Sequence, residues 1–224
     1  MNNNVEAVIF DMDGTLVNNM QYHRDAWISF FHQHKIEIDD QKFSVQDLKP
    51  ATEMVEKYFS DRNPSVEEIQ SFAEDEERTY REHYKPHIEE VKGLTPLLQE
   101  LNQRGIKVGL ATMENIPNIN FILDELNIRN YFQVITDGSE VTEGKPNPEV
   151  FLKTIDKLQV KKQNCRVIED SLGGVIAALD AGIEVIGITT TYTEKELLER
   201  GCCFTIEDFN DKKLLQLFGK LFKY

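Results

Sequence analysis

Two aspartates that follow a short apolar run are the residues of this chain best suited to chemistry. Residues 8–10 (VIF) favour a β-strand and are too few for a helix, and Asp11 and Asp13 follow them. In open α/β sheets, ligands bind where the strands end at their carboxyl side. Two carboxylates this close repel each other unless a cation or a shared proton compensates them. The stretch therefore predicts a metal ion at the end of a buried strand.

Later predicted strands end in further polar residues. Thr112 follows the second predicted strand, Lys145 lies in the loop after the third, and Glu169 and Asp170 follow the fourth. The carboxyl ends of parallel strands share one edge of a sheet, so we expect these side chains to converge with the two aspartates. A hydroxyl, an ammonium and four carboxylates suit phosphoryl transfer, because that reaction mostly requires positioning and neutralisation of anionic oxygens.

Each of these residues also has a purely structural interpretation. An Asp-x-Asp-Gly string occurs in calcium loops and in plain turns, because Asp and Gly are ordinary turn formers. Thr112 is compatible with an unremarkable strand end, and Lys145 with a lysine exposed in a loop. Glu169 and Asp170 are acids of the kind found before a helix N-terminus, although Ser171 competes for that capping position.

The apolar pattern after residue 90 predicts alternating strands and helices, which is typical of a parallel sheet covered on both faces. The first predicted helix of this part has Thr95 as its N-cap and Pro96 as its first residue. The predicted strands are 8–10, 107–111, 131–136, 166–168, 184–188 and 204–206. The predicted helices are 97–104, 116–126, one opened by Pro148, 172–181, 194–200 and 212–222.

Residues 19–88 follow a different, helical pattern. An amphipathic helix is predicted from near Asn19, and a second helical pattern covers 45–59, with Pro50 interrupting or starting it. Ser65 and Glu68 form a capping box that opens a third helix, which extends to Tyr84. Only residues 36–38 resemble a strand. The pattern predicts an all-helical insert in an α/β chain.

Composition limits the classes of partner. The 224 residues are 40% hydrophobic, which suffices for a packed core, and the formal net charge is −14. Residues 19–90 hold 9 Lys or Arg and 17 Asp or Glu, which gives 9 − 17 = −8 of that charge. We expect no nucleic acid and no membrane as partner, because both are polyanionic surfaces. A small phosphorylated metabolite would then need locally placed cations.

Cysteine usage and the absence of an apolar span indicate the expected setting. Cys165, Cys202 and Cys203 provide no disulfide framework, and the adjacent Cys202 and Cys203 lack metal-ligand spacing, so both are predicted to be buried thiols. We find neither a secretory leader pattern nor a run of about 18 apolar residues. A cytoplasmic protein, monomeric or weakly dimeric, is the expectation.

Three stretches together resemble the motifs of the haloacid dehalogenase superfamily. They are DMDGTLV at 11–17, GKPNPEVF at 144–151 and VIEDSLGGVIAALDAG at 167–182. The last resembles the acidic motif of the β-phosphoglucomutase-like subfamily, whose members carry a small helical cap after the first motif. The resemblance implies a Rossmann-like parallel-sheet core formed by residues 1–18 and 89–224, an inserted all-helical cap domain at 19–88, and a Mg²⁺ cofactor.

The resemblance also implies roles for individual residues. Asp11 corresponds to the nucleophile and Asp13 to the general acid and base, while Thr112 and Lys145 hold the transferring oxygens. The predicted metal ligands are Asp11, Asp13 through its main-chain carbonyl, Glu169 and Asp170. The predicted substrate-binding residues are His23, Lys49, Thr112, Met113 and Lys145. His23 matches a hinge histidine of the subfamily, and a partly buried structural histidine is the alternative.

Several positions depart from the mutase pattern. Asn18 replaces an aspartate, the segment 48–50 lacks a clamp arginine, and Glu76 lies near where a cap lysine is expected. Met113 and Glu114 replace small polar residues, and Glu114 would disfavour a second anionic group. We therefore expect a Mg²⁺-dependent phosphatase of a small phosphate monoester acting through an aspartyl-phosphate. The alternatives are a β-phosphoglucomutase, interconverting β-glucose 1-phosphate and glucose 6-phosphate, and a non-enzymatic phosphoacceptor.

Overall fold

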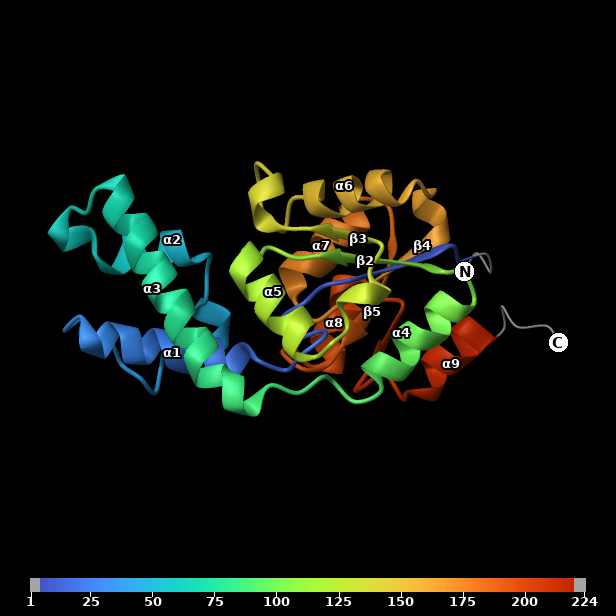
Figure 1. The fold of residues 1–224 in the computed structure, drawn as a ribbon, viewed down its shortest axis with the longest axis horizontal. Coiled ribbons are helices and arrows are strands. Elements are labelled where there is room, and N and C mark those ends of the chain that lie inside the picture. Colours follow the sequence, from blue (N-terminus) through green and yellow to red (C-terminus); the bar gives the residue numbers. More distant parts are fainter. Residues whose placement is uncertain (1–4, 220–224) are drawn as a thin grey trace. The chain divides into compact units, whose positions relative to one another are not determined.

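The computed structural model describes residues 5–219 and divides the chain into two compact units (Figure 1). The core unit joins the segment that ends at Asn18 to the segment that begins at Glu89. The helical unit spans Asn19–Ile88. Each unit has its own hydrophobic cluster, so each is described by itself.

Within the described residues, six parallel strands form one sheet in the order β3-β2-β1-β4-β5-β6. This confirms the predicted α/β core. The strands are β1 (Ala7–Phe10), β2 (Lys107–Ala111), β3 (Val134–Thr136), β4 (Cys165–Glu169), β5 (Glu184–Ile188) and β6 (Phe204–Ile206). β1 is flanked by β2 and β4, so its backbone is buried on both sides.

The register of the central strands brings the polar strand ends to one edge. Phe10 of β1 pairs with Leu110 of β2 and with Ile168 of β4. The residues that follow these three are Asp11, Ala111 and Glu169, so the site residues begin at the same level of the sheet. The Asp11 backbone N–H donates to the Ile168 carbonyl at 3.1 Å, which carries the pairing one residue beyond β1.

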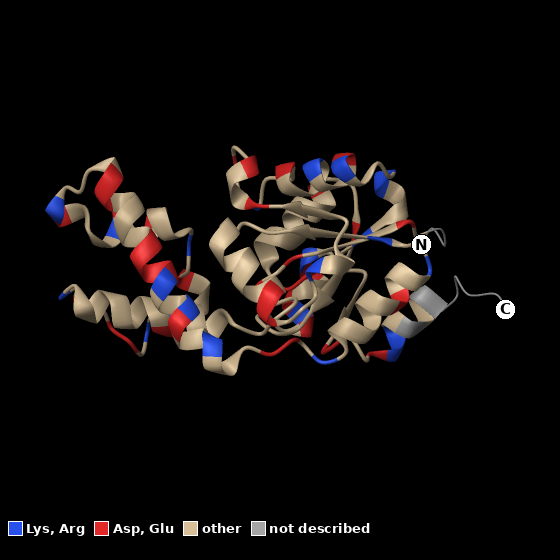
Figure 2. Cartoon of the chain, in the orientation of Figure 1, with Lys and Arg blue, Asp and Glu red and all other residues tan. Residues whose placement is uncertain are grey.

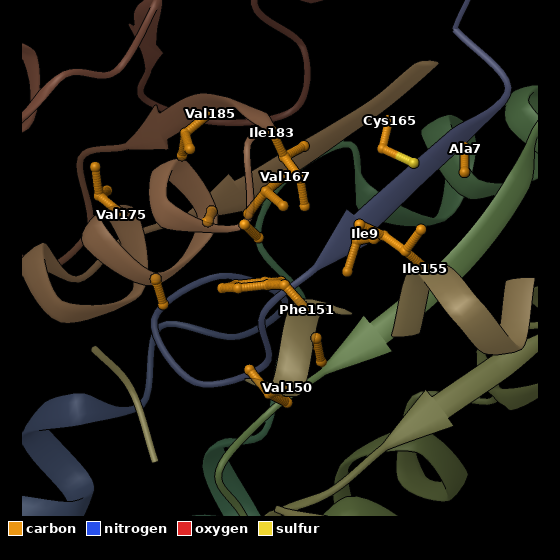
Figure 3. Close-up of a cluster of buried hydrophobic side chains, with 14 of the residues drawn as sticks. Ala7, Ile9, Val150, Phe151, Ile155, Cys165, Val167, Val175, Ile183 and Val185 are labelled. Atoms are coloured by element: carbon orange, nitrogen blue, oxygen red, sulfur yellow. The ribbon is translucent and has the colours of Figure 1, made fainter. Parts of the chain in front are cut away.

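Helices cover both faces of the sheet (Figure 1). Alternate residues of β1 point to opposite faces: Ile9 belongs to the cluster under α6 and α7, whereas Phe10 contacts the rings of Phe132 and Phe209. Figure 3 shows the cluster that contains Ile9, to which α6 contributes Val150 and Phe151 and α7 contributes Val175. The helices of the core unit are α4 (Leu94–Gln103), α5 (Ile116–Glu125), α6 (Glu149–Leu158), α7 (Leu172–Asp180), α8 (Glu194–Arg200) and α9 (Lys212–Gly219).

The helical unit consists of α1 (Met20–Gln33), α2 (Ala51–Tyr58) and α3 (Val66–Tyr84), packed around an aromatic cluster that includes Trp27, Phe30 and Phe59. The predicted Ser65 capping box is present: the Ser65 hydroxyl accepts from the Glu68 N–H at 3.2 Å. α3 carries seven Asp or Glu and two Arg, and Figure 2 shows these acidic bands. Residues 36–38 form no strand.

Some element boundaries differ from prediction. α4 begins at Leu94 after Gly93, whose φ is +85°, and Thr95 lies inside the helix, where it donates to Glu90 instead of capping. The predicted strand 131–136 is instead a 3₁₀ turn followed by the three-residue β3. The Tyr131 N–H donates to the Ile128 carbonyl within the turn, so it is not available for pairing in the sheet. The predicted last helix continues to residue 222, and 220–222 lie outside the described residues.

The cysteines differ in their exposure to solvent. Cys202 is buried as predicted, and burial raises the pKa of its thiol to about 12. Cys165 is buried as well. Cys203 is exposed, so the prediction that both adjacent cysteines are buried was wrong: side chains alternate along this extended segment after Gly201. Over residues 5–219, none of the helices combines the length and the apolar character needed to cross a bilayer.

Candidate active site

A buried lysine joins two of the predicted acids. The Lys145 ammonium donates to Asp11 Oδ1 at 2.5 Å and to Glu169 Oε2 at 2.8 Å, and a third bond reaches the Ala111 carbonyl at 3.2 Å. The side chains of Lys145, Asp11 and Glu169 are 9%, 10% and 1% exposed. Three segments far apart in sequence are thus tied together by one cation, which excludes the alternative of a lysine exposed in a loop.

Glu169 is held from its other side by the start of α7. Its Oε1 accepts from the Ser171 N–H at 3.0 Å and from the Ser171 hydroxyl at 2.7 Å. The Ser171 hydroxyl in turn accepts from the Gly174 N–H at 3.0 Å, so Ser171 is the N-cap as predicted. A Cβ at Gly174 would collide with the Glu169 carboxylate. Only glycine leaves room for the carboxylate at this position.

Asp170 lies against the turn after Asp13. Gly14 has φ of +74°, and a Cβ there would collide with Asp170 Oδ2 and come within 2.9 Å of Thr191 Oγ1. The neighbouring Thr190 hydroxyl donates to the Gly14 carbonyl. Thr190 and Thr191, which follow β5, were missed in the sequence. Their only signal was their position after a fifth strand at the same sheet edge.

Asp11, Glu169 and Asp170 offer carboxylate oxygens that all lie within 4.8 Å of one another, and all three residues are buried. Burial and the Glu169 charge raise the pKa of Asp11 to about 8, against the lowering effect of Lys145. Burial, Glu169 and Asp11 raise the pKa of Asp170 well above its ordinary value. Burial lowers the pKa of Lys145, but the two carboxylates outweigh burial and hold it above its usual range.

Thr112 and Met113 line the adjoining loops. Thr112 is buried, its N–H donates to the Thr136 carbonyl at 3.1 Å, and its hydroxyl oxygen accepts from the Glu114 N–H at 3.1 Å. The hydroxyl hydrogen of Thr112 is not needed for that bond. The Met113 side chain lies 3.0 Å from a Cβ placed on Gly144, the residue before Lys145. Met113 therefore packs against the loop that carries the lysine.

Asp13 immediately precedes the Gly14 turn and is half-buried. One of its carboxylate oxygens lies within 4.8 Å of a Glu114 carboxylate oxygen. The Asp13 carboxylate therefore lies next to the loop that follows β2.

His23 and Lys49 belong to the helical unit. His23 is buried, stacks on Tyr80 with ring centroids 3.7 Å apart, and shares with Tyr80 a bond to the Asn19 amide. This packing accords with the alternative of a structural histidine. Lys49 is exposed in a surface hollow that also carries acids, namely Asp47, Glu53 and Glu56. Those carboxylates oppose phosphate binding at Lys49.

The sequence matches the haloacid dehalogenase-like hydrolases over residues 5–182. The chain belongs to this family. It is 30% identical over 196 residues to the validoxylamine A 7'-phosphate phosphatase of Streptomyces hygroscopicus subsp. limoneus, covering 87% of this chain and 90% of that protein. It is also 30% identical over 202 residues to the β-phosphoglucomutase of Bacillus subtilis, covering 82% and 83%.

A solved haloacid dehalogenase hydrolase from Entamoeba histolytica has the same fold, with a TM-score of 0.84 and 27% identity over 96% of this chain and all of that one. The chain is therefore a member of an enzyme family with phosphatases and phosphoglucomutases among its relatives. The predicted family, the α/β core and the enzyme assignment are confirmed.

The acid cluster fits a divalent cation. Three carboxylates and the Lys145 ammonium carry formal charges of −3 and +1, which sum to −2 for these four groups. Oxygen-only donors are what Mg²⁺ prefers. The residues that would hold it are Asp11 and Asp170, with the Asp13 carbonyl, while Glu169 is already used by Lys145 and Ser171 and would support them.

Mg²⁺ affinity is predicted to rise with pH. Asp11 has its pKa raised from 3.8 to about 8 and Asp170 is raised as well, so below about pH 8 protons occupy the carboxylates that Mg²⁺ requires. The apparent Kd should increase up to about tenfold per pH unit for each proton displaced as the pH falls from 8 to 6. Calorimetry in two buffers of different ionisation enthalpy measures both the affinity and the protons released.

The folding stability of the metal-free chain should fall as the pH rises, whereas the Mg²⁺ affinity should rise. The folded metal-free chain holds these protons more tightly than the unfolded chain, so stability should fall as the pH rises from about 4 to above 8. Mg²⁺ should restore it by mass action. A Kd independent of pH between 6 and 9, with no protons released, would contradict the acid cluster as the metal site.

Two neighbouring glycines of α7 provide a matched test of the Glu169 position. Gly174→Ala should displace the Glu169 carboxylate and weaken Mg²⁺ binding and turnover by about tenfold or more, the effect expected when a residue supporting a metal ligand is disturbed. Gly173→Ala meets no atom within 4 Å, so it should keep both properties and change the free energy of unfolding by at most about 1 kcal/mol. Titration calorimetry and urea unfolding compare the two variants. Equal Mg²⁺ affinity and equal turnover in the two variants would refute the idea that a side chain at position 174 displaces the Glu169 carboxylate.

Proposed function

We propose that this protein is a Mg²⁺-dependent phosphatase of a small phosphate monoester, and that the alcohol is a sugar or polyol. The observation that carries the proposal is the buried cluster of Asp11, Lys145, Glu169 and Asp170 at the carboxyl edge of the sheet. Two relatives support the substrate class by their names, validoxylamine A 7'-phosphate phosphatase and phosphorylated carbohydrates phosphatase.

The first half-reaction transfers the phosphoryl group to the protein. An Asp11 carboxylate oxygen forms a bond to phosphorus, the phosphorus–oxygen bond of the ester breaks, and Asp13 gives its proton to the leaving alcohol oxygen. Lys145 neutralises phosphoryl oxygens from its fixed position beside Asp11, and the Thr112 hydroxyl hydrogen is available to one of them. Bound Mg²⁺ supplies charge neutralisation that lets the anionic groups approach each other.

The second half-reaction returns the protein to its starting state. Asp13 takes a proton from water, the water oxygen bonds to phosphorus, and the bond between phosphorus and Asp11 breaks to release inorganic phosphate. The same residue therefore acts as acid and then as base. The helical unit is proposed to act as a cap that selects the alcohol and excludes bulk water during the reaction.

Hydrolysis is favoured over the mutase reaction by what the helical unit offers. A mutase must hold two phosphate groups in turn, whereas the hollow at Lys49 carries three acids against two lysines, Lys49 and Lys57, and Glu76 is a fully buried acid on α3. Lysine also lacks the bidentate fork by which arginine holds phosphate. Formation of glucose 6-phosphate from β-glucose 1-phosphate, dependent on the bisphosphate, would instead support the mutase.

Asp11→Asn should abolish turnover while leaving the fold intact, because an amide is not a nucleophile towards phosphorus. Asp13→Asn should lower kcat by about 10²- to 10⁴-fold, the usual contribution of general acid–base catalysis. Phosphate release from p-nitrophenyl phosphate and from a panel of sugar phosphates, each with Mg²⁺, measures both effects.

Asp25→Asn, at an exposed residue of α1, makes the same chemical change as a control and should keep wild-type rates. Turnover by Asp11→Asn in Mg²⁺ would show that the nucleophile is another residue. A long-lived phosphoprotein without turnover in the wild type would point to a phosphoacceptor.

A further inference from the structure

Glu114 is a fixed acid beside the proposed site. It follows Thr112 and Met113 after β2, its N–H donates to the Thr112 hydroxyl at 3.1 Å, and its carbonyl accepts from the Gly138 N–H at 3.2 Å. Its Oε2 accepts from the Asn118 amide at 2.5 Å. Both the backbone and the carboxylate of Glu114 are therefore held in place.

The residues around Glu114 are built to support this orientation. Asn118 is fully buried in the first turn of α5, and its own N–H donates to the side chain of the N-cap residue Asn115 at 2.9 Å. Gly138 lies so close to the Met113 carbonyl that a side chain there would collide with it. The loops after β2 and β3 thus lock together, and the carboxylate of Glu114 has little freedom to turn away.

The position of the Glu114 carboxylate relates it to the leaving group. One of its oxygens lies within 4.8 Å of an Asp13 carboxylate oxygen. Asp13 is the residue proposed to protonate the ester oxygen of the alcohol. A substituent on the carbon next to the ester carbon lies about 3–4 Å from that ester oxygen, within reach of a group at this distance from Asp13. This distance puts the Glu114 carboxylate near the leaving group that Asp13 is proposed to protonate.

We propose that Glu114 determines substrate specificity by accepting a hydrogen bond from a donor, an ammonium or a hydroxyl, on the second carbon of the alcohol. An anionic group at the same place would meet a fixed carboxylate beside a second one, Asp13, and would be rejected. A carboxylate is an acceptor only, so it distinguishes donors from acceptors as well as cations from anions. This inference rests on the proposed phosphatase function and narrows its substrate class to monoesters without a second anionic group near the ester.

Four alkyl phosphates of nearly equal size test the proposal. Phosphoethanolamine, 2-hydroxyethyl phosphate, propyl phosphate and phosphoglycolate present an ammonium, a hydroxyl, a methyl and a carboxylate at the second carbon. The kcat/KM of the wild type should fall in that order. Where a compound is not turned over, its inhibition constant against p-nitrophenyl phosphate hydrolysis replaces kcat/KM.

Glu114→Gln keeps the size of the side chain and removes its charge. The ratio of kcat/KM for phosphoethanolamine to kcat/KM for phosphoglycolate should drop by about 10- to 100-fold. This is the range expected for a hydrogen bond to a charged group. Glu125→Gln removes the same charge from the other end of α5, where the residue is exposed, and should leave the ratio unchanged. The ratio isolates specificity, because a general loss of activity or stability affects both substrates alike.

The outcomes separate this inference from the function on which it rests. If p-nitrophenyl phosphate is hydrolysed and Asp11→Asn is inactive, but the wild type treats the four phosphates alike, Glu114 has no role in specificity and the phosphatase assignment stands. An unchanged ratio in Glu114→Gln overturns the inference in the same way. If neither p-nitrophenyl phosphate nor any of the sugar phosphates is hydrolysed in Mg²⁺, the proposed function itself is wrong.

Discussion

The mutual repulsion of buried carboxylates is the constraint on which the rest of this structure depends. Asp11, Glu169 and Asp170 lie within 4.8 Å of one another in a buried site, and a single described ammonium, that of Lys145, bonds to two of them. Such a cluster costs stability unless a cation compensates it. The sheet edge must therefore supply both rigidity and charge, and it does so through segments that are far apart in the chain.

Rigidity comes from close packing of backbone against carboxylate. Gly174 and Gly14 leave room for Glu169 and Asp170, and neither position tolerates a Cβ without moving an acid. Hydrogen bonds from Ser171 complete the support of Glu169. A carboxylate held this way cannot turn away from its neighbours to relieve the repulsion. The repulsion between the carboxylates is therefore compensated either by protons, since the pKa of Asp11 is raised to about 8 and that of Asp170 is raised as well, or by a bound cation.

Much of this arrangement could be predicted from the sequence, because each strand is a short apolar run that ends in polar residues. Asp11, Thr112 and Glu169 follow such runs, and parallel pairing then brings them to one edge. The start of α4 could not be predicted from the sequence. The helix begins at Leu94, one residue before Thr95, and this earlier start depends on packing. Thr190 and Thr191 were equally out of reach, because their role depends on which face of the Gly14 turn they approach.

The spacing of Glu114 and Asn118 in the sequence is itself a signal of their contact. Glu114 and Asn118 are four residues apart at the start of a predicted helix, a spacing at which side chains meet. The pair shows how one framework can serve different substrates. The acids and lysine at the strand ends are fixed by the sheet, and in the proposed mechanism they act on the phosphate, which is common to all phosphate monoesters. The residues just beyond the strand ends are fixed by short loops, and the proposal assigns them to the alcohol. A change at Glu114 would then alter selectivity, while the residues that act on the phosphate stay the same.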